Sequence, residues 1–228
     1  MSEELLTLRP IGHIRTQFPQ KFGIPRQSGL VEELQARVVF EEEYRIREAF
    51  RGLEDFSHLW LVWQFTESKG WSPTVRPPRL GGNRRMGVFA TRSPFRPNPI
   101  GLSCVTLEGV EYDAPDGPAL LVGGADLLDG TPILDVKPYV PLADCRPEAV
   151  GSFSDQHRED RLLVDMPSEL LEKVPSPLRS ALLGVLSQDP RPSYQKDPER
   201  VYGMAFAGLE IKFTVEGETL HVTEIHTA

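Results

Sequence analysis

Only two cysteines, five histidines and no long hydrophobic run occur among the 228 residues of this chain. Cys104 and Cys145 lack the spacing of metal ligands, so we expect free thiols in a reducing cytoplasm. No stretch reaches the roughly 18 apolar residues of a membrane-spanning helix, and the acidic first residues lack the apolar run of a secretory signal. We therefore expect a cytoplasmic protein with no metal site and no membrane segment.

A glycine-rich G-x-G-x-x-G turn is also missing, and strands do not alternate regularly with helices. These absences argue against a Rossmann-like nucleotide-binding fold, which needs that turn after its first strand. An apolar content of 39% and a charged content of 25% are those of an ordinary globular protein. The chain is long enough to bury a substantial core in one large or two small domains.

Asp and Glu are absent from residues 68–107, although the whole chain has a net charge of -8. This window carries +7 and the remainder -15, so we expect a local anion-binding surface on an otherwise acidic protein. Frequent Pro and Gly stiffen the window, and arginine on such loops suits phosphate or carboxylate. The alternative is a solvated face without a partner. The basic residues are Lys69, Arg76, Arg79, Arg84, Arg85, Arg92 and Arg96.

Short strands joined by Gly and Pro turns are expected over most of the first 147 residues. Residues 58–65 are almost continuously apolar and predict a central strand covered on both faces, whereas apolar spacing over 41–53 predicts one short helix. The expected fold class is mainly β, with an antiparallel or mixed β-barrel. The other expected strands are 8–14 (an edge strand or irregular entry), 35–40, 86–91, 100–107, 119–122 and 133–136.

A polar, proline-bearing stretch at 139–165 predicts a linker to a small C-terminal domain. Ser176 is expected to cap a helix with one buried face, and residues 209–225 alternate as a hairpin does. The sequence therefore predicts a barrel domain at 1–147 and a linker with a small α+β domain at 148–228.

Residues 87–103, GVFATRSPFRPNPIGLS, resemble the signature of the TrmO (TsaA-like) family almost without interruption. Three further blocks resemble the family in order: 25–27, 55–60, and 129–132 running into 135–139. Residues 189–194 resemble a block of the longer bacterial members, so the resemblance covers most of the chain.

The resemblance implies a barrel-type, S-adenosylmethionine-dependent tRNA methyltransferase that forms a homodimer and binds the donor on barrel loops near the subunit interface. It implies methylation of the N6 nitrogen of the threonylcarbamoyl-bearing adenosine immediately 3′ of the anticodon in threonine-type tRNA. Thr66 and Glu67 depart from the family's usual His–Gln pair, so we expect any donor contact there to use the backbone. The donor residues carried over are Pro25, Arg26, Gln27, Thr66, Glu67, Arg92, Leu102, Asp129, Gly130, Thr131 and Pro132.

The residue types suit this chemistry. Arg92 can hold a carboxylate in fork geometry, although a surface ion pair is the alternative. Asp135 is a candidate base, with Lys137 or Tyr139 positioned by the same strand, and a structural Asp135–Lys137 ion pair is the alternative. The candidate RNA contacts are Arg76, Arg79, Arg84, Arg85, Arg96, Arg191 and Tyr194.

Two other functions fit the same residues. A non-enzymatic barrel could grip tRNA through the basic loops as a chaperone or adaptor. A barrel enzyme could instead act on a small anionic nucleotide. All the barrel signature blocks precede residue 147, which predicts that a fragment ending near Pro147 folds and binds the methyl donor.

Overall fold

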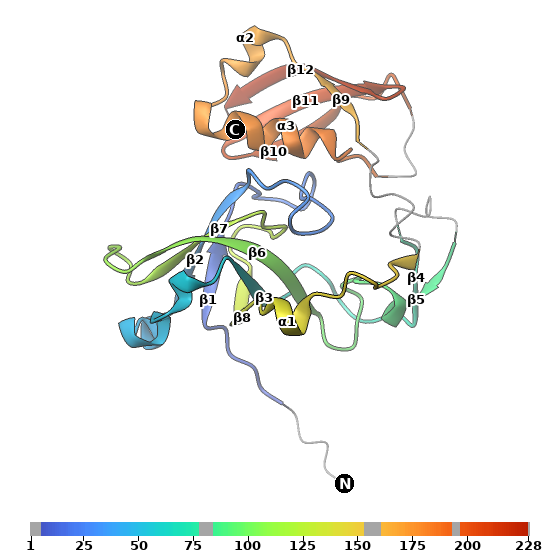
Figure 1. Cartoon of the computed structure of the whole chain (residues 1–228). Helices are drawn as coiled ribbons and strands as arrows, with labels where there is room; N and C mark the ends of the chain where they lie inside the picture. Colours follow the sequence, from blue (N-terminus) through green and yellow to red (C-terminus); the bar gives the residue numbers. More distant parts are fainter. Residues whose placement is uncertain (1–5, 78–83, 153–160, 193–196, 228) are drawn as a thin grey trace.

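The computed structural model describes residues 6–77, 84–152, 161–192 and 197–227. Two of the predicted RNA contacts, Arg79 and Tyr194, lie outside these residues. A β-barrel forms one half of the molecule, and a sheet with short helices forms the other half (Figure 1). Within the described ranges, no helix has the length and apolarity required to cross a membrane.

Six antiparallel strands close the barrel, which confirms the predicted mainly β fold class. Their side chains alternate as the sequence predicts, so the apolar residues of each strand fill the interior. In order around the barrel the strands are β1 (Gly12–Arg15), β2 (Gln35–Phe40), β7 (Ala119–Gly123), β6 (Ile100–Glu111), β3 (His58–Gln64) and β8 (Pro132–Pro138), which pairs with β1.

Strand β3 lies between β6 and β8, as a central strand should, but it is not covered on both faces. Leu59, Leu61 and Trp63 point inward and are buried, whereas Trp60 and Val62 on the other face are only half-buried. The prediction that both faces of this strand are covered was therefore wrong, because the apolar side chains of Trp60 and Val62 lie on the outer surface of the barrel.

The predicted helix at 41–53 is wrong. Three separate 3-10 turns occupy this stretch, η1 (Glu42–Tyr44), η2 (Arg47–Phe50) and η3 (Leu53–Asp55). Extended backbone at Ile46 and left-handed backbone at Gly52 separate them. The spacing of three to four residues fits 3-10 turns as well as an α-helix, which explains the error.

The predicted strand at 86–91 is also shorter than expected. Strand β5 (Met86–Gly87) pairs with β4 (Thr74–Val75), and the chain then forms a 3-10 turn, η5 (Val88–Ala90). Arg96 fixes this turn by donating to the carbonyl oxygens of Val88 and Thr91, at 3.1 and 2.7 Å.

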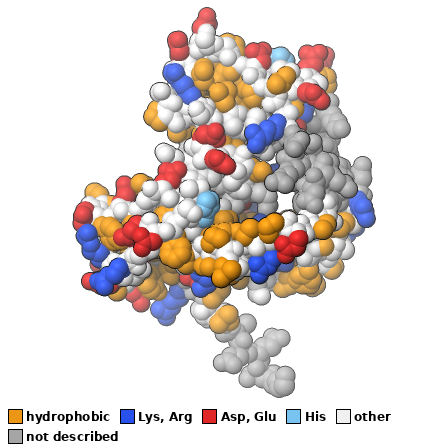
Figure 2. All heavy atoms as spheres, in the orientation of Figure 1, with side chains coloured by type: hydrophobic (Ala, Val, Ile, Leu, Met, Phe, Trp, Pro, Cys, Tyr) orange, Lys and Arg blue, Asp and Glu red, His pale blue; other side chains and the backbone are white. Residues whose placement is uncertain are grey.

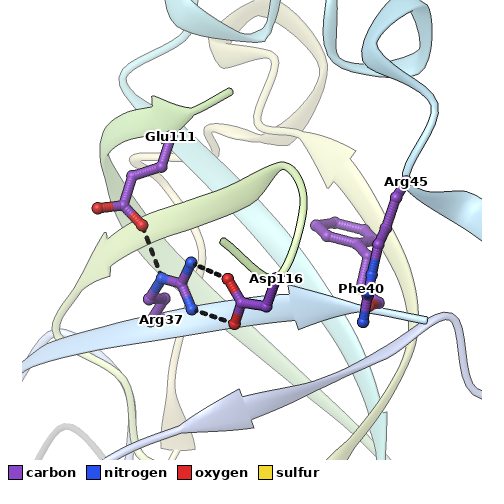
Figure 3. A network of polar contacts seen from close by, with 5 residues as sticks. All are labelled: Arg37, Phe40, Arg45, Glu111 and Asp116. Atoms are coloured by element: carbon purple, nitrogen blue, oxygen red, sulfur yellow. Dashed lines mark hydrogen bonds and ion pairs between the residues drawn. The ribbon is translucent and has the colours of Figure 1, made fainter. Parts of the chain in front are cut away.

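An ion-pair network ties the β6–β7 turn to β2 (Figure 3). The Arg37 guanidinium donates to both carboxylate oxygens of Asp116, at 2.7 and 2.6 Å, and to Glu111 at 2.6 Å. The hydrogen bonds from Arg37 lower the pKa of Asp116 to about 2. Arg45, the other arginine drawn, donates to the Phe40 carbonyl oxygen at 2.9 Å. Arg37 therefore has a structural role, with its charge already balanced by two acids.

The C-terminal half is a four-stranded sheet covered by helices. Leu182 and Leu186 on α3 pack against the sheet, and the expected hairpin is present. Ser176 does not cap the helix as predicted, because it is the first residue of a 3-10 turn without a side-chain cap. The sheet order is β10 (Tyr202–Phe206), β11 (Leu209–Glu216), β12 (Thr219–Thr227) and β9 (Leu163–Asp165), with α2 (Ser168–Leu171), η7 (Ser176–Leu178) and α3 (Arg179–Ser187). The predicted linker contains β9 and α1 (Pro141–Asp144).

The loop between β1 and β2 belongs to the core of the C-terminal half. Phe18, Val31 and Leu34 on this loop are at most 2% exposed and pack in the same cluster as α3 and β10–β12. The Phe18 ring meets the Phe206 ring edge-on at 5.6 Å. Figure 1 shows this loop, in blue, between the barrel and β10. The two halves of the chain therefore share a core at this loop.

Candidate functional site

Two predicted donor segments, distant in the sequence, are joined by a hydrogen bond. Arg92 Nη1 donates to Gln27 Oε1 at 2.8 Å, and Arg92 is exposed while Gln27 is half-buried. The Gln27 loop is fixed at one end because the Gly29 backbone N–H donates to the Gly124 carbonyl oxygen at 2.9 Å. Arg92 thus keeps free N–H directions while its partner Gln27 lies on a loop that is fixed at one end, as an anion-binding guanidinium requires.

The predicted donor block at 129–132 is held against β1. The Asp129 carboxylate accepts from the Thr16 backbone N–H at 3.0 Å and lies 3.6 Å from Arg15. Thr131 is 4% exposed, and its hydroxyl donates to the Leu128 carbonyl oxygen at 2.7 Å. Gly130 has φ +75°, and no atom lies within 4 Å of the place a side chain would take. The turn therefore presents a carboxylate and open backbone, while the Thr131 side chain serves the turn itself.

Thr66 and Glu67, which stand where the family usually has a His–Gln pair, follow β3, and both side chains are exposed. Lys21, on the same loop as Gln27, donates to the Glu67 carbonyl oxygen at 3.1 Å. The backbone of this segment is thereby connected to the Gln27 loop. Leu102 on β6 is 47% exposed and points to the outer face of the barrel.

The three candidate catalytic residues do not converge. Lys137 Nζ lies 2.9 Å from Asp135 Oδ2, and this hydrogen bond raises the pKa of Lys137. Asp135 and Leu102 pair with Val62 from opposite sides, so their backbones are two strand spacings, about 10 Å, apart on the outer face. Tyr139 lies four residues farther along the chain, about 13 Å from Asp135 along an extended strand. Asp135 and Lys137 thus lie closer than Tyr139 to Leu102, one of the predicted donor residues.

The predicted RNA contacts have different environments. Arg76, Arg84 and Arg85 are exposed, and Arg85 donates to the Thr74 hydroxyl at 2.8 Å across β4–β5. Arg96 is half-buried through its bonds to the η5 turn. Arg191 pairs with both oxygens of Asp189, at 2.8 and 3.0 Å, and its side chain is only 12% exposed. The exposed three are best placed to meet phosphates.

Sequence reasoning did not single out Asp126, which lies beside the predicted donor segments. Ser103 Oγ donates to Asp126 Oδ1 at 2.6 Å, and burial raises the pKa of this carboxyl group. The sequence did contain a signal, because Asp126 interrupts the apolar run from Ala125 to Leu128. Its two neighbours, Ala125 and Leu127, are buried. A charged residue within such a run is unusual without a partner.

Comparison with known proteins gives two family matches. Residues 13–145 match the model of the tRNA-methyltransferase O N-terminal domain, and residues 162–228 match that of the TrmO C-terminal domain. The first range includes every predicted donor residue, and Asp126 as well.

Individual relatives agree with these matches. The chain is 47% identical over 215 residues to tRNA (adenine(37)-N6)-methyltransferase of Escherichia coli K12, covering 90% of this chain and 91% of that protein. It is 39% identical over 142 residues to a Pyrococcus abyssi protein described as a "probable S-adenosyl-L-methionine-binding protein", covering 62% of this chain and 72% of that protein. The crystal structure of TrmO from Pseudomonas aeruginosa, 33% identical, superposes with a TM-score of 0.78 over 98% of this chain and 100% of that one.

Proposed function

The chain belongs to the tRNA-methyltransferase O family, and from this premise we propose that its substrate is threonine-type tRNA whose adenosine next to the anticodon carries a threonylcarbamoyl group. It is an S-adenosylmethionine-dependent methyltransferase of the N6 nitrogen of adenine 37 in tRNA. Similarity to the E. coli enzyme over nearly the whole chain carries this assignment. The proposal goes beyond this assignment by naming the threonylcarbamoyl group and the class of tRNA.

The residues at the barrel loops fit S-adenosylmethionine, which supplies a methyl group on a positively charged sulfur when bound. Arg92 offers its guanidinium to the donor carboxylate, and Gln27 holds that guanidinium in place. The exposed Asp129 carboxylate suits ribose hydroxyls, and the open backbone at Gly130 leaves room for a flat base edge. A cationic fork, a carboxylate and an uncovered turn match the chemical groups of the donor.

Replacement of Arg92 by alanine tests this donor site. Arg92→Ala is expected to leave the fold intact, because Arg92 is exposed, and to weaken donor binding by about 1.5–3 kcal/mol, the range for a hydrogen bond to a charged group. Titration calorimetry with S-adenosylmethionine measures the change, and Arg84→Ala, another exposed arginine, serves as the matched control. Equal affinities for the wild-type and Arg92→Ala proteins would remove Arg92 from the site.

We assign the proton acceptor to Asp135 rather than Tyr139. The N6 nitrogen of a threonylcarbamoyl adenosine belongs to a urea, so it must lose a proton as the methyl group arrives. Asp135 lies on the same outer face as Leu102, and Lys137 Nζ at 2.9 Å fixes the position of its carboxylate. Asp135→Asn should lower kcat by about a hundredfold or more with unchanged donor affinity. A variant with wild-type kcat would exclude Asp135.

The exposed arginines of the β4–β5 region support a surface for tRNA phosphates. Replacing both Arg84 and Arg85 with Glu should weaken tRNA binding and reduce the slope of log affinity against log salt by roughly one to two, since each phosphate contact contributes about 0.7–0.9. Donor affinity should not change, because neither residue contacts a donor segment in the described structure. An unaltered salt slope would show that these side chains face away from the tRNA.

Exposed apolar residues on one face of the barrel support a homodimer. Ile100 and Leu102 on β6 and Val140 and Leu142 next to and on α1 are 39–93% exposed. Figure 2 shows hydrophobic side chains gathered on the barrel face over β3 and α1. Apolar patches of this kind mark interfaces, and Leu102 also belongs to the predicted donor set. Sedimentation of the wild-type protein and of Leu142→Glu would test the proposal: a monomeric wild type would contradict it.

We also propose that the protein works in the cytoplasm, where a tRNA substrate is available. Cys104 and Cys145 are both free thiols, consistent with a reducing compartment. Recovery of the native protein outside the cytoplasmic fraction would contradict this localisation.

Two measurements separate this function from its rivals. A non-enzymatic RNA-binding barrel would bind tRNA without binding S-adenosylmethionine in calorimetry. An enzyme acting on a small nucleotide would bind the donor and fail to methylate tRNA. We expect both donor binding and turnover on total tRNA from the wild-type protein, and absence of either would overturn the proposed function.

A further inference from the structure

A buried polar chain leads from the barrel interior to the donor loops. Trp63 Nε1 donates to Ser103 Oγ at 3.0 Å, and Ser103 Oγ donates to Asp126 Oδ1 at 2.6 Å. Ser103 is completely buried, and Asp126 lies between the buried residues Ala125 and Leu127. The Asp126 carboxylate is thus fixed from the barrel side by a hydroxyl that is itself fixed by an indole.

The other side of Asp126 faces the predicted donor segments. The Gln27 loop is anchored beside this segment, because the Gly29 backbone N–H donates to the Gly124 carbonyl oxygen at 2.9 Å. The Ser28 backbone and the positive charge of Arg92 both favour the ionised form of the Asp126 carboxyl group. Arg92 in turn donates to Gln27 at 2.8 Å. One carboxylate therefore adjoins the Gln27 loop, Arg92 and, through Ser103, the Leu102 segment.

The position of this charge has a chemical consequence. A guanidinium that receives the donor carboxylate would also repel the positively charged sulfur of the same donor. A fixed carboxylate beside Arg92 offsets that repulsion and orients the guanidinium, provided that it is ionised. Taking the proposed function as given, we propose that Asp126 is a positioning residue of the donor site, which assembles Arg92 and the Gln27 loop around the methyl donor.

The test is donor binding by Asp126→Asn, which keeps the shape of the side chain and its acceptor for Ser103 but removes the charge. We expect S-adenosylmethionine affinity to fall and the donor KM to rise about tenfold or more, because the charge that orients Arg92 and offsets its repulsion of the donor sulfur is lost. We expect kcat at saturating donor to stay within about twofold. Asp113→Asn is the matched control, because this acid is exposed, pairs with Arg47 and lies on the β6–β7 turn.

A pH series gives a readout that a purely structural role would not change. Burial raises the pKa of Asp126, so its charge is lost as the pH falls through that raised value. Arg92 remains charged throughout, and Ser28 and Ser103 carry no charge. Wild-type donor affinity should therefore fall on acidification, and the affinity of Asp126→Asn should fall less.

The outcomes separate this inference from the proposed function. A wild-type protein that binds no S-adenosylmethionine contradicts the proposed function itself. A folded Asp126→Asn protein with wild-type donor affinity overturns the positioning role, and so does a loss of kcat with unchanged donor affinity. If Asp126→Asn does not fold, Ser103→Ala replaces it: this variant removes one hydrogen bond to the carboxylate, and unchanged donor affinity in it overturns the inference.

Discussion

A chain that ends at Pro147 should lose donor binding by at least about a hundredfold and should aggregate, which is the reverse of what the sequence predicts. Phe18, Val31 and Leu34 would then be exposed, because their partners lie in the C-terminal half. Burial of each stabilises the fold by about 1.5–3 kcal/mol. Together they contribute about 5–9 kcal/mol, comparable with the total stability of a domain, about 5–15 kcal/mol.

The loss would reach the donor site through the loop between β1 and β2. This loop carries Gln27, the partner of Arg92, and the backbone N–H of Ala207 in the C-terminal half donates to the Gln17 carbonyl oxygen at 2.8 Å. Without these contacts the loop must be ordered on binding, and each 1.4 kcal/mol of that cost weakens affinity about tenfold.

Calorimetry on the fragment and on full-length point variants measures this effect. Phe18→Leu should weaken donor binding, whereas Phe50→Leu, a matched change in the barrel core, should lower stability with little effect on affinity. A soluble 1–147 fragment with the donor affinity of the full chain would show that the loop holds its position alone.

Threonine tRNA that carries the threonylcarbamoyl group should be methylated at least about a hundredfold more efficiently than the same tRNA made by transcription. An unmodified adenosine amine is a poor nucleophile, because its lone pair is delocalised into the purine ring. The modification changes the acidity of that nitrogen and adds a carboxylate near it. Loss of a charge-assisted contact to this carboxylate is sufficient for such discrimination.

Among the arginines in the described part of the chain, Arg96 is the candidate partner of the threonyl carboxylate. Its Nη1 is fixed by the carbonyl oxygens of Val88 and Thr91, which leaves Nε and Nη2 to face a ligand. Initial rates at saturating donor on the two tRNAs measure the discrimination, and Arg96→Gln should reduce it. Equal kcat/KM for both tRNAs would contradict the threonylcarbamoyl part of the proposal, even for an active methyltransferase.

Local patterns predicted strands of both the barrel and the C-terminal sheet. Alternation at 35–40 and 209–215 corresponds to β2 and β11, because a strand with one face in a core needs a period of two. At 58–65 the central strand was predicted correctly, but not that some of its apolar side chains lie on the outer face. At 41–53 the helix prediction was wrong, because the apolar spacing suits 3-10 turns as well as an α-helix. These errors arise where tertiary packing decides between local alternatives.

The candidate site was predictable only in part. The blocks that resemble the family identified Gln27 and Arg92, but not that they form a hydrogen bond. The packing of Phe18 in the C-terminal core and the contact of Ser103 with Asp126 connect residues far apart in the sequence, and no local pattern encodes them. The Ser103–Asp126 contact continues the pairing of β6 with β7, in which Thr106 lies opposite Gly123, and the Phe18 contact forms only where the barrel loop packs on the C-terminal half.

The most direct test of the whole account is transfer of a labelled methyl group from S-adenosylmethionine to total tRNA, followed by nucleoside analysis. The account predicts label on the N6 nitrogen of threonylcarbamoyladenosine, at the position next to the anticodon of threonine-type tRNA. Label on another nucleoside, or no transfer from a folded protein that binds the donor, would contradict it.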